Sequence, residues 1–478
     1  MRRKGKVKSE KLPLKTKLFY ASGDIFGGGA FNIINFFYAI FLTDVIGLKM
    51  QYIAPILLIG KIWDAVTDPL MGFITDNTRT RFGRRRPYLL AGTFLIFISF
   101  FILWYPASFP NQLGKFIYAL TAYIAFTTVF TMVMTPYTAL GAELTLDYNE
   151  RTSLNSYRLA FSIGAGLVCA VLPMLIVNAF SDIRTGYIVM AITFGLIFSI
   201  PWIGVFMFTK EREEFSKEKS TFNFFNMFFE PFKIKSFRLL IAMYLLAYLS
   251  IDVVSTIFAY YTKYYIGNEG LLPIALGALF IAEIIFIPFY AFVAKKTSKN
   301  ISYILGALVW CVAGFILFTF SPDVTMFQVI LMAAIIGAGV SAVAVMPYTI
   351  FGDVTDVAEL KFGKREEGTL SGLMTFVRKV ASGLAVAGVT FSLGIAGFVN
   401  PIDGVEQFQP ESFLFALRFI ISFVPIILLV LGIIAAVRYP LNSKRHEKLR
   451  EYLEAKRDNK TIKEELEKEI TELKKELI

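Results

Sequence analysis

Apolar runs of about twenty residues recur along the chain, and short polar segments separate them. A helix of this length crosses the hydrocarbon core of a bilayer and satisfies its own backbone hydrogen bonds there. The pattern therefore predicts an all-α polytopic membrane protein with about twelve transmembrane helices. The expected spans are residues 18–46, 52–75, 88–105, 115–140, 154–180, 187–208, 237–265, 272–294, 301–320, 324–356, 368–399 and 413–437.

The two halves of this pattern resemble each other. Pro136-Tyr137 precedes a run of acidic and basic residues in the first half, and Pro347-Tyr348 does so in the second. Six spans, a polar linker and six related spans are typical of transporters built from two pseudo-symmetric six-helix bundles, with the substrate site between the bundles. The expected parts are a cytoplasmic tail at 1–17, bundles at 18–208 and 236–438, a cytoplasmic linker at 209–235 and a charged cytoplasmic helix at 439–478.

Composition agrees with a membrane protein, because 56% of the 478 residues are hydrophobic and the mean hydropathy is +0.60. The net charge of +11 resides mainly in loops that we expect on one side of the membrane. Basic loops concentrate on the cytoplasmic side, so we expect a multi-pass protein of the cell membrane with both termini in the cytoplasm. A nucleic-acid partner is not expected, because it requires a soluble basic surface.

Residues for catalytic chemistry are scarce. Cys169 and Cys311 fall in apolar runs, and the single histidine, His446, lies in the charged tail, where we expect it to be solvated. The sequence contains no recognisable nucleophile–base pair, metal-ligand cluster or phosphate-binding loop. It therefore predicts a protein that is not an enzyme and that uses no cofactor.

The second expected span carries charges. Lys61, Asp64 and Asp68 share one face of a helix, because they are three and four residues apart. A charge at bilayer depth costs roughly 2.5–3.5 kcal/mol and is usually paired and functional. Two close carboxylates do not both stay ionised in a dry site unless a cation lies between them. The pattern predicts a sodium or proton site, and a structural ion pair with Lys61 is the alternative.

The loop after this span, residues 79–86, is strongly basic. Its arginines indicate a topological or loop-locking role on the cytoplasmic side, and substrate binding is the alternative. We expect pairs such as Asp147 with Arg84, Arg85 or Arg86 to lock that side. The residues expected in this charge lock are Lys61, Asp76, Arg84, Arg85, Arg86, Asp147, Arg151, Asp353 and Asp356.

Two motifs follow each other here, Lys61-Ile-Trp-Asp64-Ala-Val-Thr67-Asp68-Pro69-Leu-Met-Gly72 and Thr80-Arg-Phe-Gly-Arg-Arg-Arg-Pro87. Together with Pro136-Tyr-Thr-Ala-Leu140, they resemble the signature of the glycoside–pentoside–hexuronide cation symporters, which belong to the major facilitator superfamily and include the melibiose permeases. The resemblance implies a major facilitator fold. It also implies symport of a sugar with Na⁺ or H⁺ by alternating access.

The same resemblance implies a cation site built from the second and fourth spans. Asp64 and Asp68 match the two acids of the family, and would be the metal ligands if the coupling ion is sodium. Thr131 matches a hydroxyl ligand on the fourth span, and Lys379 matches a lysine that approaches the acids from the other half. The family has an asparagine where this chain has Thr67, which supplies one oxygen.

A sugar or glycoside substrate requires aromatic faces with carboxylate, amide and guanidinium groups that bind hydroxyls. The candidate contacts are Asp24, Asn32, Asn35, Tyr137, Arg158 and Tyr348. Tyr137 and Tyr348 follow prolines, so packing is an alternative role for them. The alternative functions are a lipid or drug carrier on the same fold and a non-transporting membrane sensor or assembly protein.

The C-terminal tail is rich in Lys, Arg and Glu, with apolar residues at near-heptad spacing. These residues are Ile462, Leu466, Ile470, Leu473 and Leu477. We expect a solvated amphipathic helix under the cytoplasmic face, and self-association or binding to a partner helix is the alternative. The linker phenylalanines at 222, 224, 225, 228 and 229 predict an interfacial segment.

Overall fold

The computed structural model describes residues 11–145, 147–211, 230–363, 367–402, 405–457 and 464–477. Within these ranges the regular structure is helical, apart from two isolated bridges, Thr80–Gly83 and Ile402–Val405. The prediction of an all-α protein is confirmed. The linker phenylalanines and Ile462 lie outside the described residues, so the predictions about them are not addressed.

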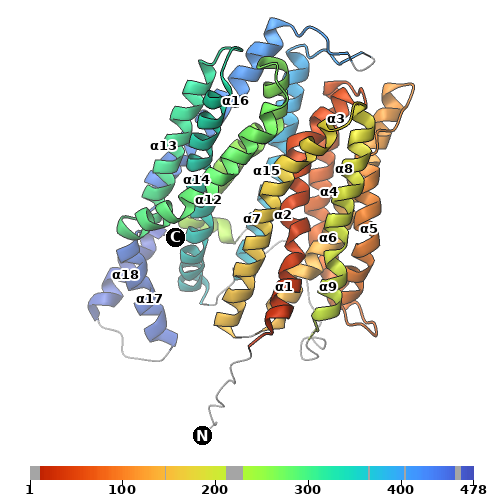
Figure 1. The fold of residues 1–478 in the computed structure, drawn as a ribbon. Helices are drawn as coiled ribbons and strands as arrows, with labels where there is room; N and C mark the ends of the chain where they lie inside the picture. The colour runs from red at the N-terminus through yellow and green to blue at the C-terminus, as the bar shows by residue number, and fades with distance from the viewer. Residues whose placement is uncertain are drawn as a thin grey trace. The chain divides into compact units, whose positions relative to one another are not determined.

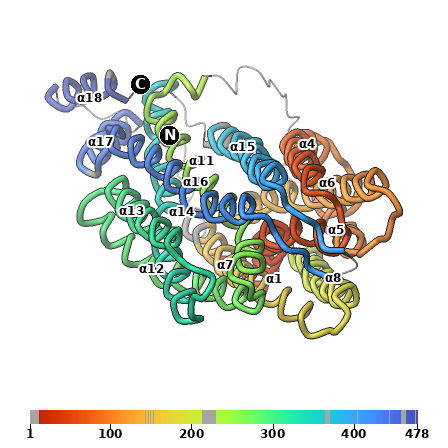
Figure 2. Tube along the Cα trace, turned by 90° about the horizontal axis from the view of Figure 1, so that it is seen from above, coloured from red at the N-terminus to blue at the C-terminus, as the bar shows by residue number. Residues whose placement is uncertain are grey.

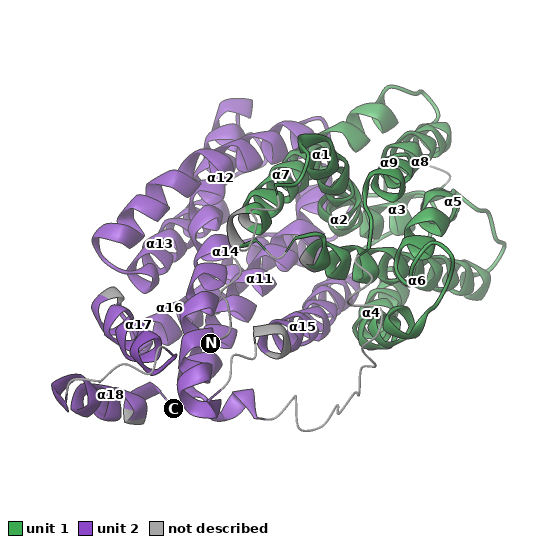
Figure 3. Cartoon of the chain, turned by 90° about the horizontal axis from the view of Figure 1, so that it is seen from below, with its two compact units in different colours: residues 1–222, 398–408 green, residues 223–397, 409–478 purple. Residues whose placement is uncertain are grey.

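The chain forms two compact units, which Figure 3 shows in different colours. Unit 1 comprises Met1–Phe222 and Phe398–Phe408, and unit 2 comprises Asn223–Gly397 and Gln409–Ile478. The exact domain limits expected from the sequence stay predictions.

The helices of unit 1 are labelled in Figure 1. They are α1 (Leu14–Ser22), α2 (Asp24–Ile33), η1 (Ile34–Tyr38), α3 (Ala39–Asp44), α4 (Met50–Asn77), α5 (Arg86–Trp104), α6 (Gln112–Leu144), α7 (Tyr148–Asn178), α8 (Ile183–Ser199) and α9 (Pro201–Phe208). Those of unit 2 are η3 (Pro231–Lys233), α11 (Lys235–Tyr260), η4 (Tyr261–Tyr265), α12 (Leu271–Lys296), α13 (Lys299–Phe318), α14 (Met326–Phe362), α15 (Glu367–Ile395), α16 (Glu411–Val437), α17 (Ser443–Arg457) and α18 (Glu464–Leu477).

Eleven helical stretches among the described residues are long and apolar enough to cross a membrane. Helix α4 is not one of them, because Lys61, Asp64 and Asp68 make it too polar for this criterion. It is nevertheless a continuous helix of 28 residues. With α4 included, the arrangement agrees with the expectation of about twelve spans.

The sequence repeat has a counterpart in the helices. The first long helix of unit 1 contains the π-helical segment η1, and the first long helix of unit 2 ends in the π-helical segment η4. A π segment accommodates one surplus residue in an α-helix and often marks a functional position. Pro136 lies inside α6 and Pro347 inside α14, again at related positions.

The C-terminal tail forms two helices, α17 and α18, which lie side by side in Figure 2. Ile470, Leu473 and Leu477 of α18 are buried, as is Leu449 of α17. The Ser236 hydroxyl of α11 donates to the Leu477 carbonyl at 3.2 Å. The apolar face of the tail is therefore covered by helices of its own unit.

Candidate functional site

The carboxylates of α4 meet a hydroxyl of α6 in unit 1. Asp64 is 1% exposed, and Thr131 is 2% exposed. The Thr131 hydroxyl lies 2.8 Å from Oδ1 of Asp64 and 3.0 Å from Oδ1 of Asp68. A further hydrogen bond joins the two helices, because Trp63 Nε1 donates to the Thr128 hydroxyl at 2.8 Å. Three of the predicted cation-site residues thus lie together.

The other predicted members of this site have different surroundings. The Thr67 hydroxyl donates to the backbone carbonyl of Trp63 at 2.9 Å. The Lys61 ammonium lies 4.4 Å from the centre of the Phe31 ring. Lys379 is half-buried on α15 of unit 2. Its approach to the carboxylates of unit 1 stays a prediction.

A second polar cluster of unit 1 joins α2 to α7. Arg158 Nε donates to Asp24 Oδ2 at 2.8 Å, and its Nη2 donates to Oδ1 at 3.3 Å. The guanidinium also lies 4.9 Å from the centre of the Tyr137 ring. The Tyr137 hydroxyl donates to the Tyr20 carbonyl at 2.7 Å, and the Tyr20 hydroxyl donates to the Tyr137 carbonyl at 2.9 Å. Tyr137 is fully buried, so the structure gives it a packing role beside the ion pair.

Two predicted substrate contacts remain open to a ligand. Asn32 and Asn35 are half-buried, on α2 and η1. Among the described residues, neither side-chain amide has a hydrogen-bond partner. Each amide offers two donors and one carbonyl acceptor. Both side chains are therefore available to bind hydroxyl groups.

Unit 2 contains a matching cluster that the sequence analysis missed. Arg378 Nη1 donates to Asp252 Oδ2 at 2.7 Å, and Nη2 donates to Oδ1 at 2.9 Å. The Asp252 side chain is 3% exposed. The guanidinium lies 4.9 Å from the centre of the Tyr248 ring. The repeated spacings Tyr20-x₃-Asp24 and Tyr248-x₃-Asp252 were the sequence signal that could have identified this pair.

Tyr348, a predicted substrate contact, belongs to the same cluster. Its hydroxyl lies 3.2 Å from that of Tyr244, and its ring packs edge-on against Tyr248. Unlike Tyr137, it is 54% exposed. The repeated Pro-Tyr position thus gives a buried tyrosine in unit 1 and an accessible one in unit 2.

The basic loop of unit 1 is organised by acidic side chains. Arg84 pairs with Glu143, and Arg85 Nη2 lies 3.0 Å from the same carboxylate and 3.1 Å from Asp76. Both arginines are buried despite their charge. Glu143 was not among the predicted residues. It stands near the end of α6, where an acid following an apolar run was the available signal.

Glu211 was also missed, and it determines the conformation of this loop. Its carboxylate accepts the backbone N–H groups of Arg84, Arg85 and Arg86 at 2.8, 2.8 and 2.9 Å. These donors lie at the start of α5, where helical N–H groups have no intrahelical acceptor and favour negative charge. Glu211 follows the apolar helix α9, and its partner was not predictable from local spacing.

Asp147 and Arg151 lie at the start of α7. Asp147 Oδ1 accepts the backbone N–H of Glu150 at 3.0 Å, so Asp147 caps this helix. Arg151 is exposed. The pairing of Asp147 with the arginines of the basic loop stays a prediction. Glu150 in turn binds Lys17 Nζ of α1 at 2.8 Å and accepts the backbone N–H of Leu12, just before α1, at 3.0 Å.

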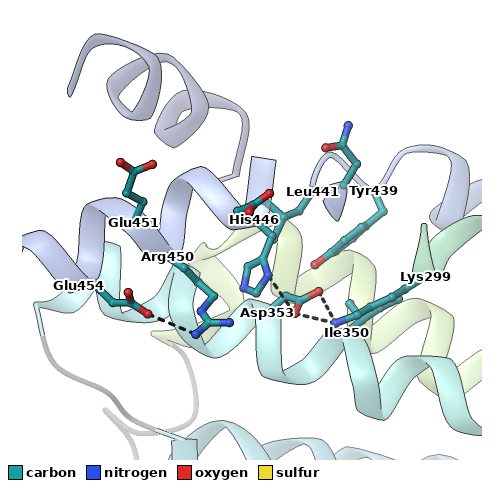
Figure 4. A pocket seen from close by; sticks show the side chains of 11 residues that line it. Lys299, Ile350, Asp353, Tyr439, Leu441, His446, Arg450, Glu451 and Glu454 are labelled. Carbon is teal, nitrogen blue, oxygen red and sulfur yellow. Dashed lines mark hydrogen bonds and ion pairs between the residues drawn. The ribbon is translucent and has the colours of Figure 1, made fainter. Parts of the chain in front are cut away.

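Asp353 and Asp356 form a charged cluster with the C-terminal tail of unit 2. Figure 4 shows the contacts of Asp353 with Lys299 and His446. Lys299 Nζ lies 2.7 Å from Asp353 Oδ1. His446 Nε2 lies 2.9 Å from Asp356 Oδ2, and its Nδ1 lies 3.5 Å from Asp353 Oδ1. The expectation of a solvated histidine was wrong, because α17 packs against α14 and brings His446 onto the two acids.

Arg378 was not among the predicted site residues, although its neighbour Lys379 was. A buried acid on the adjacent helix, Asp252, satisfies its guanidinium within the bundle.

This helical arrangement is that of a membrane transporter of the major facilitator type. It matches the crystal structure of a D-xylose–proton symporter with a TM-score of 0.64, over 89% of this chain and 96% of that one. The two sequences are 15% identical, so the likeness concerns the fold. The chain belongs to the family described as MFS/sugar transport protein, whose model matches residues 19–443. The prediction that the protein is not an enzyme is confirmed.

Several curated relatives match nearly the whole chain. A Synechocystis protein named "Uncharacterized symporter sll1374" is 29% identical, over 95% of this chain and 99% of its own length. "Putative glycoside/cation symporter YagG" of Escherichia coli is 28% identical, over 91% and 94%. "Sodium-dependent lysophosphatidylcholine symporter 1-B" of Danio rerio is 25% identical, over 94% and 91%.

Proposed function

We propose that the protein is a cation-coupled symporter and that Asp64, Asp68 and Thr131 bind the coupling ion. The observation that carries this proposal is a single hydroxyl within 3.0 Å of two carboxylate oxygens. A hydroxyl has one proton and donates it to one acceptor at a time. A further positive charge favours the second close contact, and a bound proton or sodium ion supplies such a charge.

Oxygen chemistry around this site favours sodium. Hard cations prefer carboxylate, hydroxyl and carbonyl oxygens. Pro69 has no backbone N–H, so the helical carbonyl of Ala65 loses its usual donor and becomes a further oxygen beside the two acids. No group of three or more His, Cys, Asp or Glu side chains that suits a metal ion occurs in the described residues. Two acids with neutral oxygens suit a monovalent ion.

For the substrate, we favour a sugar or glycoside. Asp24 and Arg158 offer a carboxylate and a guanidinium, and Asn32 and Asn35 offer unpartnered amides. Such groups bind the hydroxyls of a sugar, because some of them donate hydrogen bonds to a hydroxyl and others accept hydrogen bonds from it. A lysolipid is the second candidate, because relatives named as sodium-dependent lysophosphatidylcholine symporters match over the same length.

The proposal includes transport by alternating access across the cell membrane, with both termini in the cytoplasm. Each unit has one acid–arginine cluster, Asp24 with Arg158 in unit 1 and Asp252 with Arg378 in unit 2, and each cluster offers groups that bind hydroxyls. The Arg84–Arg85–Glu143 cluster then acts as part of a cytoplasmic charge lock.

Counterflow in proteoliposomes tests the proposal. A panel of labelled glycosides, pentosides, hexuronides and lysophosphatidylcholine is offered with and without sodium, and Asp68→Asn serves as the coupling control. Sodium-stimulated exchange of one sugar, with net uptake lost in the control, is the expected result. Exchange of the lysolipid alone would reject the sugar substrate, and no sodium or pH effect on any substrate would reject cation coupling.

A further inference from the structure

Helix α12 of unit 2 carries one acidic residue, Glu283, within an otherwise apolar span. The neighbours on both sides are apolar, from Ile281 to Pro288. The other charged residues of α12 are Lys295 and Lys296 at the helix end. Among the described residues, the Glu283 carboxyl has no hydrogen-bond or ion-pair partner. A carboxyl group in such a position is rare in a membrane span and is usually functional.

The internal repeat places Glu283 at the position of Asp64. Asp64 lies five residues before Pro69 of α4, and Glu283 lies five residues before Pro288 of α12. Each proline is followed by eight more helical residues (77 − 69 and 296 − 288). The two acids are therefore at the same depth, about 20 Å from the corresponding helix end at 1.5 Å per residue. This depth lies inside a hydrocarbon core of about 30 Å.

Glu283 lies on the packed face of its helix. Residues seven positions apart share one face of an α-helix, and the residues seven before and seven after it, Leu276 and Tyr290, are 0% and 3% exposed. One turn before it, the Leu279 carbonyl approaches Gly337 of α14 so closely that an added Cβ there would lie 2.1 Å away. The Glu283 side chain therefore leaves the helix on the protein side of α12, next to a close contact between α12 and α14.

The other members of the Asp64 site have no counterpart around Glu283. The position of Asp68 corresponds to Ile287, and that of Thr131, five residues before the proline of its helix, corresponds to Ala342. A sodium ion needs several oxygens, whereas a proton needs one carboxylate. Unit 2 therefore has an acid, Glu283, at the position of Asp64, but it lacks the additional ligands for a metal ion at the positions of Asp68 and Thr131.

We propose that Glu283 forms a second cation-binding site of the protein and that its ligand is a proton. Binding converts the carboxylate into a neutral carboxylic acid and forms one O–H bond, with the proton taken from water. The residue thus gives unit 2 its own protonation site, separate from the sodium or proton site at Asp64 and Asp68. The inference does not depend on the identity of the substrate.

Infrared difference spectroscopy during a pH titration tests this proposal on the full chain in lipid nanodiscs. We expect a carbonyl band of a protonated carboxylic acid that titrates in the wild type, persists in Asp68→Asn and disappears in Glu283→Gln. A spectrum of Glu283→Gln that equals the wild type at every pH would overturn the proposal.

A sodium-binding measurement separates this proposal from the proposed function. Sodium should raise the Tm of Glu283→Gln as it does that of the wild type, and the rise should be absent in Asp68→Asn. If Glu283→Gln does not fold, Glu283→Asp preserves the acid. A titrating band shifted in the Asp variant would support the proposal, whereas an unshifted wild-type band would overturn it, since the signal would then belong to another residue.

Discussion

Thr131 lies 2.8 Å from Asp64, although the two residues are 67 positions apart and belong to different helices. This contact defines the candidate cation site, because the same hydroxyl also reaches Asp68. Thr131→Val removes the hydroxyl with little change in shape, and we expect sodium to bind less tightly. A hydrogen bond to a charged group contributes about 1.5–3 kcal/mol, which corresponds to roughly tenfold to a hundredfold in Kd.

The sodium-dependent increase in Tm of purified protein measures this effect, since a ligand that binds the folded state stabilises it. Thr131→Ser preserves the hydroxyl and should remain close to the wild type. Equal sodium dependence in the Val and Ser variants would remove Thr131 from the site.

The Asp252–Arg378 pair of unit 2 should be important for stability. Removing one partner of a buried ion pair leaves the other charge without compensation, at a cost of roughly 3–5 kcal/mol. We expect Arg378→Met to lower the Tm strongly, and Asp252→Leu with Arg378→Met to recover much of the loss. The exposed pair Arg450–Glu454 provides the matched control, where the same experiment should change the Tm little. Additive losses in the double variant would contradict this interpretation.

Gly83 should tolerate no side chain. It adopts φ +107°, and an added Cβ would lie 2.5 Å from the Glu211 carboxylate that binds the start of α5. We expect Gly83→Ala to open the basic loop and to increase the labelling of Thr75→Cys, which is buried near the end of α4, by a water-soluble thiol reagent. Gly72→Ala is the control, because its Cβ would meet only a Thr135 methyl at 3.9 Å. Similar labelling in both variants would show that the Glu211 contact does not close this loop.

Acid should release the segment before α1. The Glu150 pKa is lowered from 4.5 by the hydrogen bond from Lys17 and by the backbone N–H of Leu12. A lowered pKa means that the contact stabilises the fold above the ordinary pKa and is lost as pH falls through the lowered one. A spin label attached to Lys11→Cys at neutral pH should therefore gain mobility as pH falls below the ordinary glutamate pKa of about 4.3. Glu150→Gln should make that mobility independent of pH over this range. A persistent pH dependence in the variant would assign it to another group.

The parts of the fold that depend on chain composition were predictable. Apolar run length identifies the spans, and the expected all-α transporter with a major facilitator fold is confirmed. The acids of α4 were recognisable because they interrupt an apolar run, and the family resemblance identified Thr131 on a distant helix. Bringing Thr131 to them requires α4 and α6 to pack with a particular register, which periodicity alone does not determine.

The missed residues have a common physical reason. Glu211, His446 and Arg378 each interact with an acid or backbone group far away in the chain. The sequence does not show which partner tertiary packing provides for each of these charges. The internal repeat indicates site residues that the sequence motifs do not contain. Comparing its halves position by position identifies Asp252, and it also points to Glu283.

The π-helical segment η1 divides the first long helix of unit 1 into two segments with different rotational phase. One surplus residue turns everything beyond it by about 100° relative to a continuous α-helix. The side chains before Ile34 and after Tyr38 therefore follow two separate helical wheels, whereas η4 ends its helix at Tyr265 and the chain turns at Gly267. A cysteine accessibility scan along residues 14–44 would record a pattern of period 3.6 whose phase changes at η1, as in two helices joined end to end.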